Sequence, residues 1–254
     1  MKILAIGNSF SDDSMEYLYP VLLALGEKDI SLGNLYIGGC PIDRHVANAR
    51  ESTPDYDYRT NTQNEWHTLS GHTSLAAIRS QTWDVITMQQ ASYDSGRAET
   101  YGGLSKLIGF VDENATGMPK LLWNMTWAYQ SDTTHAGFAN YGNDQMAMYN
   151  GIVNAVKTRV LPTQRFAAVI PVGTAIQNAR TSYLGDTLTR DGFHLSIPYG
   201  RYIAALTWGR ILTGKTVRGI SYEPDGVDEK MKAVAIEAVE NAIVSPFEIK
   251  EIVL

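Results

Sequence analysis

Residues 1–13, MKILAIGNSFSDD, place a short apolar run directly before a turn that contains Ser9. The run Lys2–Ile6 is too short to be the apolar segment of a signal peptide, and no small-residue cleavage site follows it. It therefore predicts a buried strand. Apolar residues then recur at the three- and four-residue spacing of one helical face, at Met15, Leu18, Val21, Leu22 and Leu25. This order places Ser9 at the carboxyl end of the strand.

The alternation of strand and helix continues along the chain. Apolar runs predict four more strands, at residues 30–37, 83–89, 120–125 and 166–172, and helices are predicted at 148–156, 201–212 and 227–244. The pattern predicts one α/β domain over residues 1–254, a three-layer α/β/α sandwich around a five-stranded parallel sheet. Its site is expected at the carboxyl ends of the strands. The polar segment Pro41–Ser74 is expected to be a loop that forms a wall or lid of that site.

Charge and composition argue against several kinds of partner. The formal net charge is −6 and the basic residues are scattered, whereas nucleic acid and anionic lipid require a concentrated basic surface. No apolar run approaches the roughly 20 residues that cross a bilayer. Cys40 is the only cysteine, so it forms no internal disulfide. A bacterial cytoplasmic protein and an exported protein whose signal was removed both fit, and the oligomeric state is not indicated.

Ser9 is the first candidate for a catalytic residue. It opens the first predicted helix, where a backbone N–H can stabilise an oxyanion and a neighbouring base can activate the hydroxyl as a nucleophile. The alternative is an N-capping turn in which Ser11, Asp12 or Asp13 accepts hydrogen bonds from the first helical N–H groups. Both can hold, because the cap and the nucleophile can be different residues.

The second candidate segment is Arg190-Asp191-Gly192-Phe193-His194-Leu195, which precedes a helix predicted to begin near Pro198. An Asp three residues before a His can accept a hydrogen bond from the imidazole Nδ1 and leave Nε2 free to act as a base. The alternative is a surface histidine that has a carboxylate nearby by chance.

Together, the two segments resemble the first and last blocks of the SGNH, or GDSL-like, hydrolase superfamily. The resemblance covers the whole chain in order and spacing, and it implies a catalytic triad of Ser9, His194 and Asp191. The finer spelling is similar to a bacterial branch near the carbohydrate acetylesterases: GNSFS at 7–11, YIGGC at 36–40, QQAS at 89–92 and RDGFHL at 190–195.

The resemblance also implies an oxyanion hole with three donors: the N–H of the nucleophile, a glycine N–H after the second strand and a side-chain amide after the third. Gly39 fits the second position, although two adjacent glycines are equally typical of a tight turn. The usual G-x-N-D block is absent, so Gln89 is expected to supply the amide. Gln90 is the weaker alternative, because neighbouring strand residues face opposite sides. Asn8 and Phe10 replace the Asp and Leu of the GDSL motif.

Other residues are weaker candidates. Trp127, just after the fourth predicted strand, can stack on a sugar ring or pack in the core. Possible metal ligands are Asp12, Asp13, His45, His67, His72 and His135, but no pair has the H-E-x-x-H spacing. The glycines form neither G-x-G-x-x-G nor a P-loop. We therefore expect no metal and no cofactor.

The resemblance thus implies a serine esterase that removes small acyl groups, above all acetyl, from a carbohydrate through an acyl-enzyme. Its expected partner is a small-molecule or polysaccharide ester, without nucleic acid or membrane. Two alternatives remain open: a hydrolase of lipid or other short-chain esters, and a non-catalytic glycan-binding protein with the same fold. A Gln89 or Gln90 amide that points at Ser9 favours catalysis, whereas two amides turned away favour binding.

Overall fold

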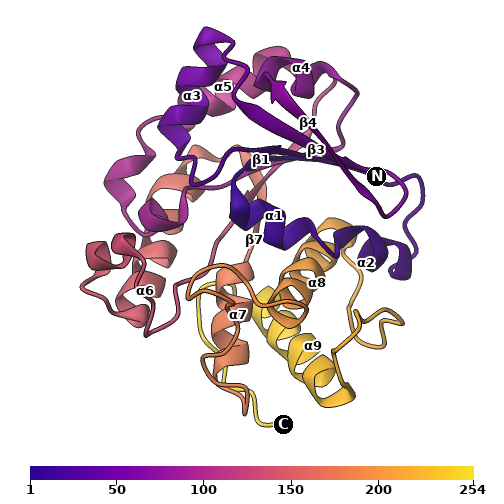
Figure 1. Cartoon of the computed structure of the whole chain (residues 1–254), viewed down its shortest axis with the longest axis vertical. Coiled ribbons are helices and arrows are strands. Elements are labelled where there is room, and N and C mark those ends of the chain that lie inside the picture. The colour runs from indigo at the N-terminus through magenta and orange to yellow at the C-terminus, as the bar shows by residue number, and fades with distance from the viewer.

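The central sheet contains seven strands in the order β4-β3-β2-β1-β5-β6-β7. The computed structural model describes all residues from 1 to 254 (Figure 1). The five strands predicted from apolar runs are parallel to one another: β1 (Lys2–Gly7), β2 (Ser31–Tyr36), β5 (Val85–Met88), β6 (Lys120–Asn124) and β7 (Phe166–Ile170). Strands buried on both faces are apolar throughout, which is why their runs were readable. The predicted α/β fold with a parallel core sheet is confirmed.

Residues 41–74 are not a loop, and this part of the prediction is wrong. They form α3 (Ile42–Glu51) and an antiparallel hairpin, β3 (Tyr56–Asn61) and β4 (Trp66–His72). The hairpin adds two further strands to the sheet beside β2. The hairpin buries Tyr56 and Tyr58, but most of β4 is exposed. An antiparallel pair with one solvated face needs no continuous apolar run, so its polar sequence is typical of a loop as well.

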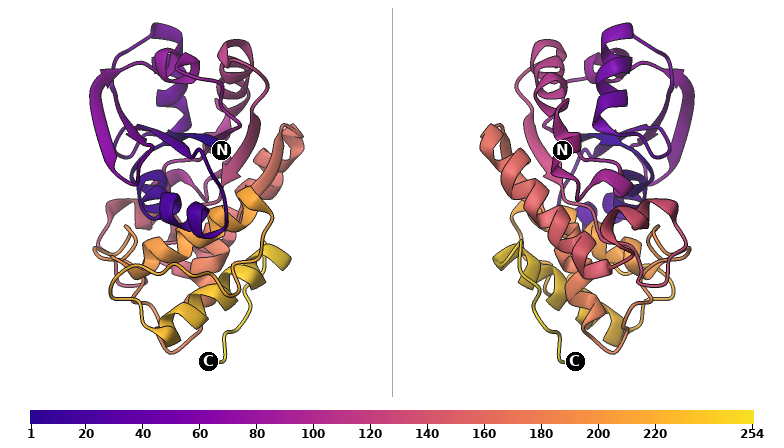
Figure 2. Two further views of the ribbon diagram at one scale, coloured as in Figure 1. Left: turned by 90° about the vertical axis from the view of Figure 1, so that its right-hand side faces the viewer. Right: turned by 90° about the vertical axis from the view of Figure 1, so that its left-hand side faces the viewer.

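Helices cover both faces of the sheet (Figure 1, Figure 2). One group packs together from the two ends of the chain: α1 (Ser9–Met15), α2 (Leu18–Ala24), α7 (Val172–Arg180), α8 (Tyr199–Thr213) and α9 (Glu229–Val244). The other group consists of α3, α4 (Ser74–Arg79) and α5 (Leu104–Asn114). The remaining helical segments are η1 (Ser92–Asp94), η2 (Ala98–Tyr101), η3 (Ala136–Tyr141), α6 (Gln145–Ala155), η4 (Val156–Val160) and η5 (Leu161–Thr163).

The first predicted helix is divided into α1 and α2. Pro20 has no N–H to donate to the carbonyl of Glu16, so a continuous helix through this point would lose a hydrogen bond. The first helix accordingly ends at Met15 and the second begins at Leu18. Pro20 then lies in the first turn of α2, where its missing N–H costs nothing.

The architecture determines where a site can lie. The five parallel strands end at one edge of the sheet, and the residues that follow them there include Asn8, Gln89 and the Gly38-Gly39 turn. Beneath this edge a continuous core contains four buried tryptophans, Trp83, Trp123, Trp127 and Trp208. None of the helices combines the length and apolar character needed to cross a membrane.

Candidate active site

Ser9 lies in the first turn of α1, directly after β1, and is half-buried. The helix is capped by Asn8, whose backbone is extended and whose Oδ1 accepts a hydrogen bond from the Phe10 N–H at 3.0 Å. The alternative cap made by Ser11, Asp12 or Asp13 is therefore wrong. Because Asn8 performs the capping, the Ser9 hydroxyl is free for another role.

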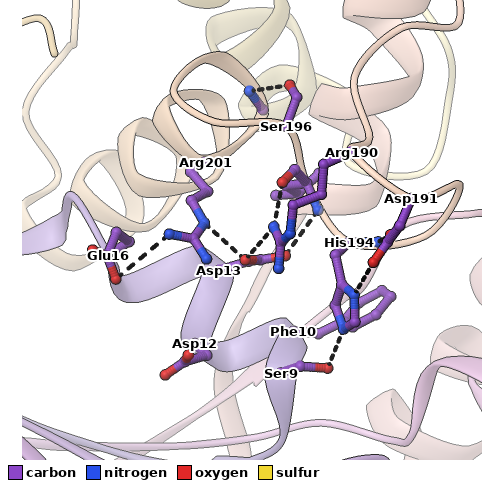
Figure 3. A network of polar contacts seen from close by, with 12 residues as sticks. Ser9, Phe10, Asp12, Asp13, Glu16, Arg190, Asp191, His194, Ser196 and Arg201 are labelled. Atoms are coloured by element: carbon purple, nitrogen blue, oxygen red, sulfur yellow. Dashed lines mark hydrogen bonds and ion pairs between the residues drawn. The ribbon is translucent and has the colours of Figure 1, made fainter. Parts of the chain in front are cut away.

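The structure brings Ser9, His194 and Asp191 together, although Ser9 and His194 are 185 positions apart in the chain. His194 Nε2 lies 2.8 Å from Ser9 Oγ, and His194 Nδ1 lies 2.6 Å from Asp191 Oδ2 (Figure 3). A carboxylate only accepts hydrogen bonds, so the proton of the neutral ring is on Nδ1. Nε2 is then free to accept the hydroxyl proton of Ser9, which is the arrangement a serine nucleophile requires.

Asp191 is held in its ionised form by its own loop. Its Oδ1 accepts hydrogen bonds from the backbone N–H groups of Phe193 at 3.2 Å and His194 at 2.8 Å. Partial burial raises the pKa of the Asp191 carboxyl, but the hydrogen bonds from the His194 ring and from the two backbone N–H groups outweigh this effect and hold the pKa below its ordinary value. The carboxylate therefore stays charged near neutral pH and orients the imidazole.

A buried carboxylate ties α1 to the loop that carries His194. Asp13 is 1% exposed, and its Oδ1 accepts hydrogen bonds from Arg190 Nη1 at 2.9 Å and Arg201 Nε at 2.8 Å (Figure 3). Its Oδ2 accepts one from the Leu195 N–H at 2.8 Å. This role of Asp13 was not predicted from the sequence. The available signal was its position one helical turn after Ser9, together with the opposite charge of Arg190 beside Asp191.

The turn that contains Gly39 is joined to the turn that contains Ser9. The carbonyl of the next residue, Cys40, accepts a hydrogen bond from Asn8 Nδ2 at 3.2 Å, which joins the two turns. Gly39 has φ +61°, and its N–H has no hydrogen-bond partner within the protein. A positive φ favours glycine, and a free N–H at this place can serve as a donor to a substrate oxygen.

Neither glutamine points its amide at the reacting centre. Gln89 Nε2 donates to Asn8 Oδ1 at 2.8 Å, and Gln90 donates from Nε2 to the Thr100 carbonyl at 3.0 Å while its Oε1 accepts the Ile42 N–H at 3.0 Å. Both side chains are almost fully buried. Gln89 therefore supports the residue that precedes Ser9, and the predicted oxyanion role of Gln89 or Gln90 has no support in these contacts.

Gln89 belongs to a chain of buried hydrogen bonds that crosses the edge of the sheet. Trp208 Nε1 on α8 donates to Asn124 Oδ1 at 3.1 Å, and Asn124 Nδ2 donates to Gln89 Oε1 at 2.7 Å. Gln89 then donates to Asn8, which donates to the Cys40 carbonyl. We call these residues, Trp208, Asn124, Gln89 and Asn8, the amide chain. Each amide in it bonds through both oxygen and nitrogen, so none can turn over without losing partners.

Trp127 does not face the site, and its predicted contact with a sugar is wrong. The side chain has no exposed surface, and its ring stacks on Phe10 with the centroids 4.1 Å apart and an interplanar angle of 11°. Its Nε1 donates to the Phe193 carbonyl at 2.7 Å. Trp127 thus contacts the neighbours of two triad residues, because Phe10 follows Ser9 and Phe193 precedes His194.

The loosely proposed metal ligands do not come together. His45 is fully buried with its Nδ1 2.9 Å from the Tyr56 hydroxyl, while His67 and His72 lie on β4. No three His, Cys, Asp or Glu side chains are close enough to share a metal ion.

Comparison with known proteins places the chain in a family. Residues 2–242 match the model described as a domain of unknown function, DUF4886. The crystal structure of a DUF4886 family protein from Bacteroides uniformis ATCC 8492 is 42% identical and superposes with a TM-score of 0.95, covering 99% of this chain and 98% of that one. No similar sequence was found among curated proteins.

More distant structures share the fold at low identity. A catalytic mutant of an acetylxylan esterase from Geobacillus stearothermophilus is 14% identical with a TM-score of 0.54, covering 87% of this chain and 94% of that one. A member of the lipolytic protein G-D-S-L family from Veillonella parvula DSM 2008 is 12% identical with a TM-score of 0.52, covering 83% and 96%. The chain therefore belongs to the DUF4886 family and has the fold of the SGNH hydrolases.

Proposed function

We propose that this protein is a serine esterase in which Ser9 is the nucleophile, His194 the general base and Asp191 the residue that orients His194. The observation that carries the proposal is the unbroken contact from Ser9 Oγ to His194 Nε2 at 2.8 Å and from His194 Nδ1 to Asp191 Oδ2 at 2.6 Å. A serine hydroxyl becomes a useful nucleophile only when such a base removes its proton.

In the first half of the reaction, His194 takes the proton of Ser9 as Oγ attacks the ester carbonyl carbon. The negative oxygen that forms is stabilised by the N–H groups of Ser9 and Gly39. His194 then gives its proton to the leaving alcohol, and an acyl-enzyme remains on Ser9. In the second half, water attacks the acyl carbon with His194 again as base, and the acid leaves from Ser9. Asp191 remains ionised throughout.

For the substrate, we propose a small acyl group, above all acetyl, on a carbohydrate. This choice is supported by the fold shared with an acetylxylan esterase. A long-chain lipid ester fits less well. A cavity of about 780 Å³ lies at the amino ends of the strands against Trp83, Leu122 and Ile211, at the opposite edge of the sheet from Ser9. It therefore offers no channel for an acyl chain that is bound to Ser9.

The test is hydrolysis of p-nitrophenyl acetate, p-nitrophenyl butyrate and acetylated xylose by the native protein, Ser9→Ala and His194→Ala. Removal of a triad residue lowers kcat on the order of 10⁴–10⁶-fold in a serine hydrolase. Ser105→Ala is the matched control, because Ser105 is an exposed serine on α5 whose hydroxyl makes no hydrogen bond to the site. Ser9→Ala should also escape labelling by a fluorophosphonate, whereas Ser105→Ala should be labelled like the native protein.

A glycan-binding protein without catalysis is the second candidate. It is favoured by one observation, that the Gln89 and Gln90 amides are both engaged away from Ser9. Esterolysis that is no faster in the native protein than in Ser9→Ala, together with unchanged affinity for acetylated xylose, would replace the esterase proposal by this one.

A further inference from the structure

Three aromatic residues outside the triad form a wall beside the His194 side of the site. We call Tyr93, His135 and Phe193 the site wall. The Phe193 ring contacts the His194 ring with centroids 4.1 Å apart, and the His135 ring packs edge-on against Phe193 at 4.6 Å. Tyr93 donates from its hydroxyl to the Gly39 carbonyl at 3.2 Å. The site wall therefore extends from the base to the turn that carries the free Gly39 N–H.

The site wall is continuous because the turn after His135 packs against Tyr93. A Cβ placed on Gly137 would lie 2.4 Å from Tyr93 Cβ, so only glycine allows this approach. Tyr129 lies behind His135 with ring centroids 4.8 Å apart, and its hydroxyl is hydrogen-bonded to Ser92 at 2.7 Å. The His135 ring is thus held in one position by Phe193 and Tyr129, and the turn after it is held by Tyr93.

His135 presents a neutral N–H donor rather than a charge. Its Nδ1 accepts a hydrogen bond from the Gly137 N–H at 3.0 Å, so the proton of the neutral ring is on Nε2. Burial lowers the pKa of His135, and the nearby His194 lowers it further while Asp191 acts in the opposite direction. The Nε2 atom has no partner in the protein and is not enclosed. It is a fixed donor that lacks an acceptor.

The chemistry of the triad indicates which part of a substrate lies beside this donor. His194 Nε2 must give its proton to the leaving oxygen, so the alcohol part of the ester lies on the His194 side of Ser9. The oxyanion lies on the Gly39 side, where the free N–H is found. Phe193 and His135 continue outward from His194. They are therefore placed along the alcohol part rather than along the acyl group.

We propose that His135 is a specificity-determining residue whose Nε2–H donates a hydrogen bond to a second oxygen atom in the alcohol part of the ester. The inference rests on the proposed esterase function and deepens it, because it selects alcohols that carry a further hydroxyl or ether oxygen beside the ester. Phe193 holds the ring at the correct distance, and Gly137 fixes the tautomer that donates.

The test compares two acetates that differ by one hydroxyl, trans-2-hydroxycyclohexyl acetate and cyclohexyl acetate. The native protein should show the higher kcat/KM for the hydroxylated ester. His135→Asn should lower the ratio of the two kcat/KM values about three- to tenfold, the usual worth of one neutral hydrogen bond. His135 is the N-cap of η3, because its side chain accepts the Gly137 N–H. Asparagine keeps an acceptor for this N–H and so preserves the cap, but it removes the donor at the position of Nε2.

A ratio is the useful readout, since a general loosening of the site lowers both values together. An unchanged ratio in His135→Asn, with the native enzyme active, overturns the inference and leaves the esterase function intact. Binding tests it without turnover: Ser9→Ala should bind xylose tetraacetate more tightly than Ser9→Ala/His135→Asn in an NMR titration. Equal dissociation constants also overturn it. A native protein that binds the acetate through His135 but never cleaves it refutes the esterase proposal alone.

Discussion

Replacing Asp13 by asparagine should destabilise the fold and slow ester hydrolysis together. Asp13 is the counter-charge that both Arg190 and Arg201 share, and it also accepts the Leu195 N–H. Asparagine has nearly the same shape, so it keeps the packing but supplies one acceptor oxygen and no charge. The two guanidinium groups would then face an uncharged amide, and Arg201 would keep only the more distant Glu16 carboxylate at 3.8 Å. The perturbation is therefore electrostatic and acts on the loop that positions His194.

The size of the effect follows from burial. Removing one partner of a buried ion pair costs about 3–5 kcal/mol when the remaining charge is out of contact with water. Here the carboxylate is 1% exposed, but the Arg190 side chain is 33% exposed and that of Arg201 is 14% exposed. Water therefore screens part of the remaining charge, and we expect a loss of about 2–4 kcal/mol. In a chain of this length, that corresponds to a fall in Tm of roughly 5–15 °C.

Thermal unfolding and acetate-ester kinetics measure the two effects, with Asp112→Asn as the matched control. Asp112 also pairs with an arginine, Arg165, but the two side chains are 39% and 36% exposed. Loss of such a surface pair costs about 0–1 kcal/mol. Asp13→Asn should in addition lower kcat more than it raises KM, measured at a temperature where both variants are folded. A Tm and kcat that match those of Asp112→Asn would refute the anchoring role of Asp13.

Three further changes test two other supports of the site and one buried histidine outside it. Gly192→Ala should abolish most activity, because Gly192 has φ +90° and a Cβ there would lie 2.4 Å from Thr133 Oγ1; a variant with native kcat would contradict this. Gln89→Leu should cost about 1–3 kcal/mol in urea unfolding and lower kcat, since it leaves the amide of Asn8 short of a partner; an unchanged kcat would show that the amide chain is irrelevant to the nucleophile. Burial lowers the pKa of His45 to about 3, so below pH 6.5 the unfolded chain binds a proton that the folded chain does not. The free energy of unfolding should then fall by about 1.4 kcal/mol per pH unit as the pH decreases from 6.5. Urea titrations at pH 6.5 and 5.0 should show a smaller fall for His45→Gln, and equal falls would contradict the assignment.

Strands that are buried on both faces could be predicted from the sequence, whereas strands buried on one face could not. The strands β1, β2, β5, β6 and β7 lie within a sheet covered on both faces, so their side chains must be apolar in a row and the runs were visible. The hairpin β3–β4 is covered on one face, and β4 is exposed along most of its length. Its sequence carries little more apolar signal than a loop. The helices α1 and α2 were predicted as one helix for a different reason. Their apolar spacing continues across the break that Pro20 imposes.

In the candidate site, too, only part could be predicted. Residue types indicate which side chains can be catalytic, whereas the residues that hold them in place are identified only by contacts between distant parts of the chain. Ser9, Asp191 and His194 were predicted because the two segments that contain them resemble the first and last blocks of the SGNH hydrolases. Gln89 was also predicted to lie at the site, but its role depends on which neighbour its amide reaches. Nothing local distinguishes an amide that faces Ser9 from one that donates to Asn8. The choice is made by Asn124, which occupies the Gln89 oxygen from a strand 35 positions further along the chain and so directs the nitrogen toward Asn8. Asn8 Oδ1 accepts from Gln89 and from the Phe10 N–H at once, and Asn8 Nδ2 donates to the Cys40 carbonyl, which the Asp of the GDSL motif could not do. Gln89 therefore holds the turn that carries Ser9, and its amide does not face the place where the oxyanion would form.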